Sequence, residues 1–161
     1  MIFVCAMTMA QTNAYPLLPM PQNYKVTDKS FAMGKVKLST PVLKSEWEAF
    51  IVNAGGELAD KAAAEIKVEL LPVIDGVKLN PDEAYRLSVS GKLIKIEAVT
   101  ERGVYWALQT LRQLEKKKGK KSLFAGCEIV DWPAFRIRGF MQDVGRSYIS
   151  VEELKREIEI L

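Results

Sequence analysis

The chain has 161 residues, of which 48% are hydrophobic and 27% are charged, and its formal net charge is +3. This length suffices for one domain with a hydrophobic core but not comfortably for two, and so small a charge excess gives no reason to expect a nucleic-acid partner. Histidine is absent, which excludes a Ser-His-Asp triad and the commonest metal ligand. Cys5 and Cys127 lie too far apart to indicate a disulfide framework or a thiolate metal site, so we expect no metal and no cofactor.

Residues 1–14 predict a secretory signal peptide. The segment is apolar over about ten residues, too few to span a bilayer, and Ala10 and Ala14 offer small residues at cleavage positions. The Lys or Arg usual near the start of such peptides is missing, and the alternative is a buried N-terminal strand of the fold. The signal peptide predicts an exported protein, periplasmic or secreted, without a membrane-spanning segment.

The first regular elements follow a proline-rich stretch. In "KSEWEAFIVNAGG" the apolar residues have helical spacing around Trp47, and Gly55 with Gly56 supplies a helix stop. In "AEIKVELLPVI" Ile66 and Val68 alternate with charged residues before a proline, which predicts a half-exposed strand at the edge of a sheet.

The central stretch has the clearest local pattern. Alternating apolar residues on both sides of the Ser90-Gly91 turn predict a β-hairpin over residues 85–98. From Gly103 the period changes to that of a helix, with an apolar stripe made by Val104, Ala107, Leu108, Leu111 and Leu114. This part of the chain therefore predicts a sheet with a helix packed on it.

Two features near that helix can be interpreted either as binding sites or as ordinary surface and packing residues. The first is a cluster of lysines, which favours either a solvated helix end or loop, or phosphate binding: Lys116, Lys117, Lys118, Lys120 and Lys121. We favour the solvated end and expect no nucleic-acid partner, because no aromatic residue interleaves with the lysines. The second is the pair Tyr105 and Trp106, which we interpret as core or helix-flank residues rather than as a sugar platform.

The closing segment predicts one strand and one helix. Residues 135–142 alternate as in a strand with little purely polar surface, which is typical of a strand covered on both faces. Ser150 and Glu153 have the spacing of a capping box, and an apolar face follows at Val151, Leu154, Ile158 and Leu161. The helix has no stop signal, so we expect a βα repeat of which this chain holds only the first unit.

Three stretches together resemble the glycoside hydrolase family 20 β-N-acetylhexosaminidases: "PLLPMPQ", "AYRLSV…KIEAVTERGVYWALQTLRQL" and "IVDWPAFRIRGFMQDVGRSYISVEELKREI". The resemblance implies an α+β fold at residues 15–131, a β-sheet with packed helices that forms the family's accessory N-terminal domain. It implies that residues 132–161 are the first strand and helix of the catalytic TIM (β/α)8 barrel, which is incomplete here.

The resemblance also implies the activity. Members of the family remove terminal N-acetylglucosamine or N-acetylgalactosamine from glycans with retention of configuration, using the substrate's own acetamide as nucleophile. The catalytic Asp-Glu pair lies on a later barrel strand, so this chain contains no catalytic residue and should be inactive without the remainder of the barrel. The alternatives are a non-catalytic module that binds carbohydrate or protein, and a gene remnant without function.

One substrate-binding residue carries over from the family. Arg138 matches the arginine of the family's "RG" on the first barrel strand, which binds outer hydroxyls of the terminal sugar, and a guanidinium fork suits that task. The plainer alternative is an arginine paired with a carboxylate such as Asp143. Asp143 and Arg146 match the family's "D-x-x-R" turn, where we expect them to order the loop near the site, and Ser147 replaces the histidine common there.

Overall fold

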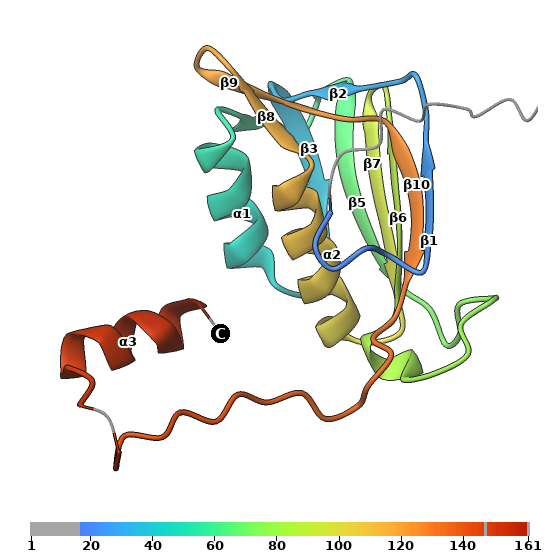
Figure 1. Cartoon of the computed structure of the whole chain (residues 1–161). Coiled ribbons are helices and arrows are strands. Elements are labelled where there is room, and N and C mark those ends of the chain that lie inside the picture. Colours follow the sequence, from blue (N-terminus) through green and yellow to red (C-terminus); the bar gives the residue numbers. More distant parts are fainter. Residues whose placement is uncertain (1–16, 147, 161) are drawn as a thin grey trace, which may run out of the picture.

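The computed structural model of the chain describes residues 17–146 and 148–160, so the predicted signal peptide at 1–14 lies outside the described residues. The described part contains a mixed seven-stranded sheet with two helices on one face (Figure 1). The order of its strands is β1 (Asn23–Val26), β10 (Cys127–Asp131), β6 (Tyr85–Ser90), β7 (Leu93–Ala98), β5 (Ala64–Leu70), β3 (Lys35–Ser39) and β4 (Glu57–Leu58). A smaller antiparallel sheet has the order β2 (Phe31–Ala32), β9 (Lys121–Phe124) and β8 (Glu115–Lys118).

The hairpin predicted for residues 85–98 is confirmed. Strands β6 and β7 pair antiparallel, and Gly91 occupies the turn with a φ of 57°, where a side chain would be strained. The alternation buries one face of the hairpin, including Leu87 and Ile96, beneath the helices and leaves Lys95 and Glu97 on the opposite face. The sheet therefore has one apolar face and one polar face, as expected for a sheet covered on one side.

The strand at residues 64–70 is also present, but its predicted position at an edge is wrong. β5 pairs in parallel with β3 on one side and with β7 on the other. Pro72 lies beyond the last paired residue, Leu70, so it removes no hydrogen bond from the sheet. The alternation of charged and apolar residues came from the open polar face of the sheet and not from an edge.

Helix α1 (Lys44–Asn53) forms where its sequence predicts and ends as predicted at the two glycines. Gly55 has a φ of 76° and donates to Val52 O, while Gly56 donates to Ile51 O at 2.8 Å. This pair of bonds is the Schellman motif, in which the left-handed residue is ordinarily glycine. Trp47 points into the core, with no exposed surface.

Helix α2 (Glu101–Gln113) begins two residues before Gly103, because Thr100 caps its N-terminus by accepting from the Arg102 amide. Its predicted apolar stripe is buried against the sheet, with Leu108 and Leu111 in the main core. Tyr85 ties the helix to the sheet through hydrogen bonds with Thr110 at 2.6 Å and Asp131 at 3.2 Å. Burial and the Asp131 charge raise the pKa of the Tyr85 hydroxyl, which therefore stays protonated.

The lysine cluster after α2 is exposed to solvent, as predicted, but most of it lies in strands and not in a helix end or loop. Strands β8 and β9 make a hairpin around Gly119, and Lys118 stands directly opposite Lys121. The helix ends at Gln113, and Leu114, with no exposed surface, anchors the start of the hairpin in the core. The hairpin extends the small sheet through β9, which pairs with β2.

The strand predicted for residues 135–142 is wrong for this structure, since residues 132–146 contain no helix or strand. A strand persists only through hydrogen bonds to a neighbouring strand, and none of the described strands lies against this segment. The helix that follows is confirmed as α3 (Val151–Ile160), which Figure 1 shows apart from the sheet. The Ser150–Glu153 capping box is also confirmed, with both reciprocal bonds present at 3.1 and 3.2 Å.

Candidate functional site

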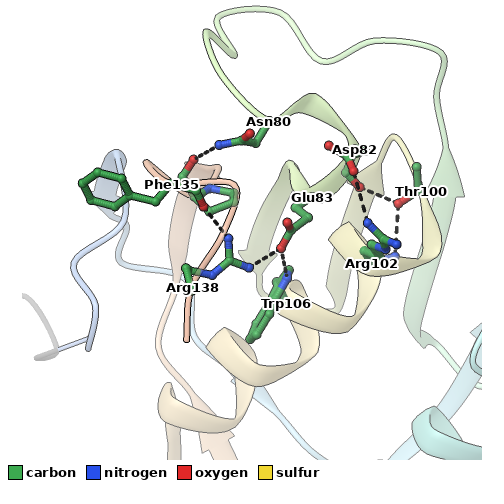
Figure 2. A network of polar contacts seen from close by, with 9 residues as sticks. Asn80, Asp82, Glu83, Thr100, Arg102, Trp106, Phe135 and Arg138 are labelled. Atoms are coloured by element: carbon green, nitrogen blue, oxygen red, sulfur yellow. Dashed lines mark hydrogen bonds and ion pairs between the residues drawn. The ribbon is translucent and has the colours of Figure 1, made fainter. Parts of the chain in front are cut away.

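A small polar site forms beside the first turns of α2, where the short 3₁₀ helix η1 (Pro81–Glu83) meets the segment that follows β10 (Figure 2). Asn80 precedes η1 with a φ of 44°, and its side-chain amide donates to Pro133 O at 2.7 Å. The Thr100 hydroxyl donates to Asp82 O while it caps α2. These two contacts fix η1 between the helix and the C-terminal segment.

Glu83 is the centre of this site. Its side chain is buried, with the residue only 8% exposed, and its Oε2 accepts from Trp106 Nε1 at 2.8 Å and from Arg138 Nη2 at 2.5 Å. Burial opposes ionisation, but the hydrogen bonds from Arg138 and Trp106 hold the pKa of the Glu83 carboxyl below its ordinary value. The carboxylate is therefore ionised at neutral pH.

Arg138, the predicted substrate-binding residue, makes an ion pair, a hydrogen bond and a contact with an aromatic ring. Besides the ion pair with Glu83, its Nη1 donates to Phe135 O at 2.6 Å, and its guanidinium lies 5.7 Å from the centre of the Trp106 ring. Arg138 pairs with Glu83 and not with Asp143, the alternative partner considered from the sequence. The arginine side chain still keeps 42% of its surface exposed.

Asp143 and Arg146, the predicted loop pair, contact each other. Arg146 Nε donates to Asp143 Oδ2 at 2.6 Å, and the Gly145 amide donates to Asp143 Oδ1 at 2.8 Å. These bonds lower the pKa of the Asp143 carboxyl, with the Arg146 contribution the largest. Ser147 lies outside the described residues.

The aromatic pair on α2 occupies the helix flank, one of the two positions expected for it. Tyr105 and Trp106 are 44% and 37% exposed, so neither belongs to the core, and both lie on the outer flank of the helix. Their rings meet edge to face, 5.2 Å apart, beside an open hollow of about 850 Å³ that Glu83 and Arg102 also line. The helical period left core and flank open, and the structure decides for the flank.

Glu83 is the residue of this site that the sequence interpretation missed. It lies 55 positions before Arg138, in a turn-like "NPDE" stretch whose pattern shows no partner. Its ion pair leaves it poorly suited to proton transfer, because a general acid needs a pKa near the working pH. The arrangement is suited instead to binding, through a guanidinium with unused donors beside an aromatic ring.

A comparison with protein families decides the relationship. The family profile described as "Glycosyl hydrolase family 20, domain 2" matches residues 14–132, which is most of the chain. The chain belongs to glycosyl hydrolase family 20. The match ends before Arg138, so the site joins the domain that the family profile describes to the segment that follows it.

Curated relatives of the chain are named β-hexosaminidases. The β-hexosaminidase of Porphyromonas gingivalis is 28% identical over 90% of this chain and 21% of its own length. The β-hexosaminidase of Vibrio furnissii is 35% identical over 63% of this chain and 16% of its own length. The chain thus spans about a fifth of the length of these curated relatives.

Solved structures agree with this relationship. The family 20 exo-β-N-acetylglucosaminidase of Vibrio harveyi, solved in complex with N-acetylglucosamine, matches 93% of this chain and 24% of its own with 34% identity and a TM-score of 0.68. The β-N-acetylhexosaminidase of Bacteroides fragilis matches 91% of this chain and 31% of its own, with a TM-score of 0.70, and at 24% identity it supports the fold alone. The mixed sheet with packed helices is therefore that of a family 20 N-terminal domain.

Two features are absent from the part of the chain that the structure describes. No group of three or more Cys, Asp or Glu side chains is arranged to hold a metal ion. No helix among these residues is both long and apolar enough to cross a membrane.

Proposed function

We propose that this chain is the N-terminal part of an exported β-N-acetylhexosaminidase that releases terminal N-acetyl-D-hexosamine from glycans. Membership of family 20 carries the proposal, and the names of the relatives support it. The N-acetylglucosamine bound in the Vibrio harveyi structure supports the class of substrate. Residues 15–131 form the accessory domain in this proposal, and residues 132–161 begin the catalytic barrel.

The exposed apolar residues after Trp132 support a barrel that continues beyond this chain. Ile137 and Met141 are each 90% exposed, and Ile158 on α3 is also exposed. Apolar side chains at alternate positions of one segment and on one face of the next helix are what a βα unit presents to its neighbours. The missing strands would supply both the hydrogen bonds and the cover for residues 135–142.

The mechanism follows the family pattern. The acetamide of the substrate attacks its own anomeric carbon, and an Asp-Glu pair on a later barrel strand orients the acetamide and protonates the leaving oxygen. The 161 residues alone are therefore inactive. Arg138 binds neighbouring hydroxyls of the terminal sugar, because its fixed donor fork can hold two oxygens at once.

Replacement of Arg138 tests the substrate-binding role. In the complete reading frame that contains this chain, we expect Arg138→Ala to lower kcat/KM for p-nitrophenyl N-acetyl-β-D-glucosaminide by about 100-fold, since the sugar hydroxyls lose charged donors. Arg136→Ala is the matched control, because Arg136 stands two residues earlier and has no ion pair among the described residues. An Arg138 variant that matches Arg136→Ala in kcat/KM would contradict the role.

A further inference from the structure

The lysine hairpin, residues 115–124 in β8 and β9, concentrates positive charge. Residues 115–121 contain five lysines and one glutamate, a net charge of +4, whereas the net charge of the whole chain is +3. The rest of the chain is therefore slightly negative. A local excess of this kind attracts anions more strongly than the balanced charges elsewhere on the sheet do.

The register of the hairpin gives it an inner face with internal partners. Glu115 pairs with Phe124 and Lys117 with Ser122, so these four side chains share one face. Ser122 and Phe124 are buried, and Lys117 Nζ lies 2.6 Å from Glu115 Oε1. The single carboxylate of the hairpin is therefore used on this inner face.

The outer face of the hairpin carries lysines and no carboxylate. Lys118 stands directly opposite Lys121, and Lys116 stands opposite Leu123. Lys120 occupies the turn after Gly119. Lys118, Lys120 and Lys121 are exposed, and they make no ion pair with any residue that the structure describes.

This arrangement of lysines disfavours the fold. Like charges directly opposite each other on paired strands are destabilising, and Lys118 and Lys121 form such a pair. A sequence that breaks a local rule without a compensating contact in the fold indicates a functional site. A bound anion between the two ammonium groups would remove the repulsion.

The hairpin backbone is fixed before any ligand binds. The Ser122 amide donates to Ala54 O at 3.0 Å, and Lys117 Nζ donates to Asn53 O at 2.8 Å. Leu114, directly before β8, has no exposed surface. A surface held in this way loses little conformational freedom on binding.

The hairpin does not depend on the segment after Trp132. All of its contacts come from residues that match the family profile, at 14–132. β10 starts at Cys127, next to the end of β9 at Phe124, and runs away from the hairpin before the chain leaves the domain at Asp131. Figure 1 shows the hairpin and the C-terminal segment at opposite ends of the sheet. The connection to the proposed barrel therefore lies far from the lysines.

The composition of the hairpin favours one class of anion. Residues 115–122 contain no aromatic residue on which nucleic-acid bases could stack, and no arginine for bidentate contacts with phosphate. The turn between the strands has no large apolar residue that could enter a membrane. Exposed ammonium groups on a flat strand surface suit an extended polymer with repeated carboxylate or sulfate groups.

We propose that the outer face of the lysine hairpin binds an acidic polysaccharide, whose anionic groups contact Lys118, Lys120 and Lys121. The choice of a glycan rests on the proposed function, since the enzyme acts on glycans in that proposal. The hairpin keeps the polymer on the accessory domain and raises the local concentration of its chain ends near the enzyme.

Binding of labelled chondroitin sulfate tests the proposal, because this polymer carries both acidic groups and N-acetylhexosamine. For the 161-residue chain at low ionic strength, we expect Lys118→Gln with Lys121→Gln to raise the Kd about tenfold in fluorescence anisotropy. Lys44→Gln with Lys78→Gln is the matched control, which removes the same charge from two exposed positions outside the hairpin. The control should change the Kd less than about twofold.

Two outcomes of this experiment would overturn the proposal. Equal weakening by the two double variants would show that binding depends on net charge and not on the hairpin. Vesicles that contain phosphatidylserine and a DNA duplex are the competing anions. Binding of either with an affinity similar to that of chondroitin sulfate would contradict an acidic-polysaccharide site.

Urea unfolding checks the hairpin variant independently of any ligand. Its midpoint should be no lower than that of the parent chain, because the two substitutions remove a like-charge pair. A lower midpoint would show that the lysines stabilise the fold, and it would overturn the argument for a binding role.

The complete enzyme separates this proposal from the proposed function. In the complete reading frame the hairpin variant should again bind chondroitin sulfate about tenfold more weakly than the control variant. Loss of this difference would show that the rest of the enzyme covers the hairpin and would overturn the proposal. A complete protein that binds the polymer through the hairpin but releases no N-acetylhexosamine would retain the binding surface and contradict the proposed function instead.

Discussion

Charged side chains on the open face of the sheet pair with one another, both within a strand and across neighbouring strands. Lys95 on β7 donates to Glu97 at 2.7 Å and contacts Glu69 on β5 at 3.1 Å, while Arg86 on β6 contacts Glu97 at 3.3 Å. Burial opposes ionisation of Glu97, but Lys95 and then Arg86 hold the pKa of its carboxyl below the ordinary 4.5. The Glu97 side chain is only 14% exposed, so solvent screens these contacts less than it screens an ordinary surface pair.

Glu97→Gln should therefore destabilise the fold in a manner that depends on pH. At pH 7 we expect the free energy of unfolding to fall by about 1 kcal/mol, because the amide makes weaker bonds to Lys95 and Arg86. A carboxyl with a lowered folded pKa contributes above its unfolded pKa of about 4.5 and loses that contribution as the pH falls through the folded pKa. The difference between the two proteins should therefore shrink as the pH is lowered below 4.5.

Urea unfolding of both proteins between pH 3 and pH 8 measures this dependence. Glu128→Gln is the control, because Glu128 is well exposed and its pair with Lys25 is long, at 3.7 Å. A constant difference at all pH values would contradict the electrostatic origin.

At the scale of elements, the end of α1 is joined to the hairpin of β8 and β9. The Ser122 amide donates to Ala54 O at 3.0 Å, and Lys117 Nζ donates to Asn53 O at 2.8 Å. A Cβ atom on Gly55 would lie 2.0 Å from Lys120 O, so the hairpin backbone passes directly over this glycine. The lysine hairpin therefore packs against the C-terminal end of α1, at Gly55.

Replacement of two glycines separates the backbone conformation from this close approach. Gly55→Ala and Gly91→Ala both place a side chain at positive φ, which costs about 1–2 kcal/mol, but a Cβ at Gly91 meets nothing within 4 Å. We expect Gly55→Ala to lower the free energy of unfolding by at least about 2 kcal/mol more than Gly91→Ala, because the hairpin must move. Equal losses in urea unfolding would show that the hairpin does not rest on Gly55.

The elements that depend on local sequence were predictable, and those that depend on distant partners were not. The helix around Trp47 and the hairpin at 85–98 follow from spacing and turn residues close in the chain. The interior place of β5 depends on two partner strands, which its own alternation cannot reveal. The lysine hairpin was missed because charged residues mask a strand whose stability comes from pairing with β9.

The same distinction applies to the site. Arg138 could be singled out because a family motif surrounds it, and Asp143 with Arg146 because they are neighbours in sequence. Glu83 could not, because its significance arises only when η1, α2 and the C-terminal segment come together. For Tyr105 and Trp106 the sequence left both the core and the helix flank open, because a helical period distinguishes faces but not the edge of the covered face.

The described residues form a packed domain followed by a C-terminal segment that contacts it through Pro133 and Arg138. The core and both sheets are complete by Trp132, whereas large apolar side chains after it, including Phe135, Ile137 and Met141, remain exposed. Exposed apolar side chains gathered in one segment mark an interaction site or a risk of aggregation. In the proposed enzyme these side chains would pack against the remainder of the barrel.

Truncation tests this division. Residues 15–133 retain Pro133, whose carbonyl accepts from Asn80, and should unfold cooperatively, with a Tm below that of the longer chain because Glu83 loses its ion pair with Arg138. The 161-residue chain should bind more of the dye ANS and aggregate more readily, because it carries the exposed segment. A chain of residues 15–118, which lacks β9 and β10, is the control that should not fold. Failure of 15–133 to fold would contradict an independent domain.

The central claim, that this chain begins a family 20 hexosaminidase, is tested most directly by the coding DNA beyond Leu161. Read in the same frame, it should continue through further strand and helix units and encode an adjacent Asp-Glu pair on a later barrel strand. A stop codon immediately after Leu161 would contradict the claim for this polypeptide, because the chain would then lack the catalytic residues that the reaction requires.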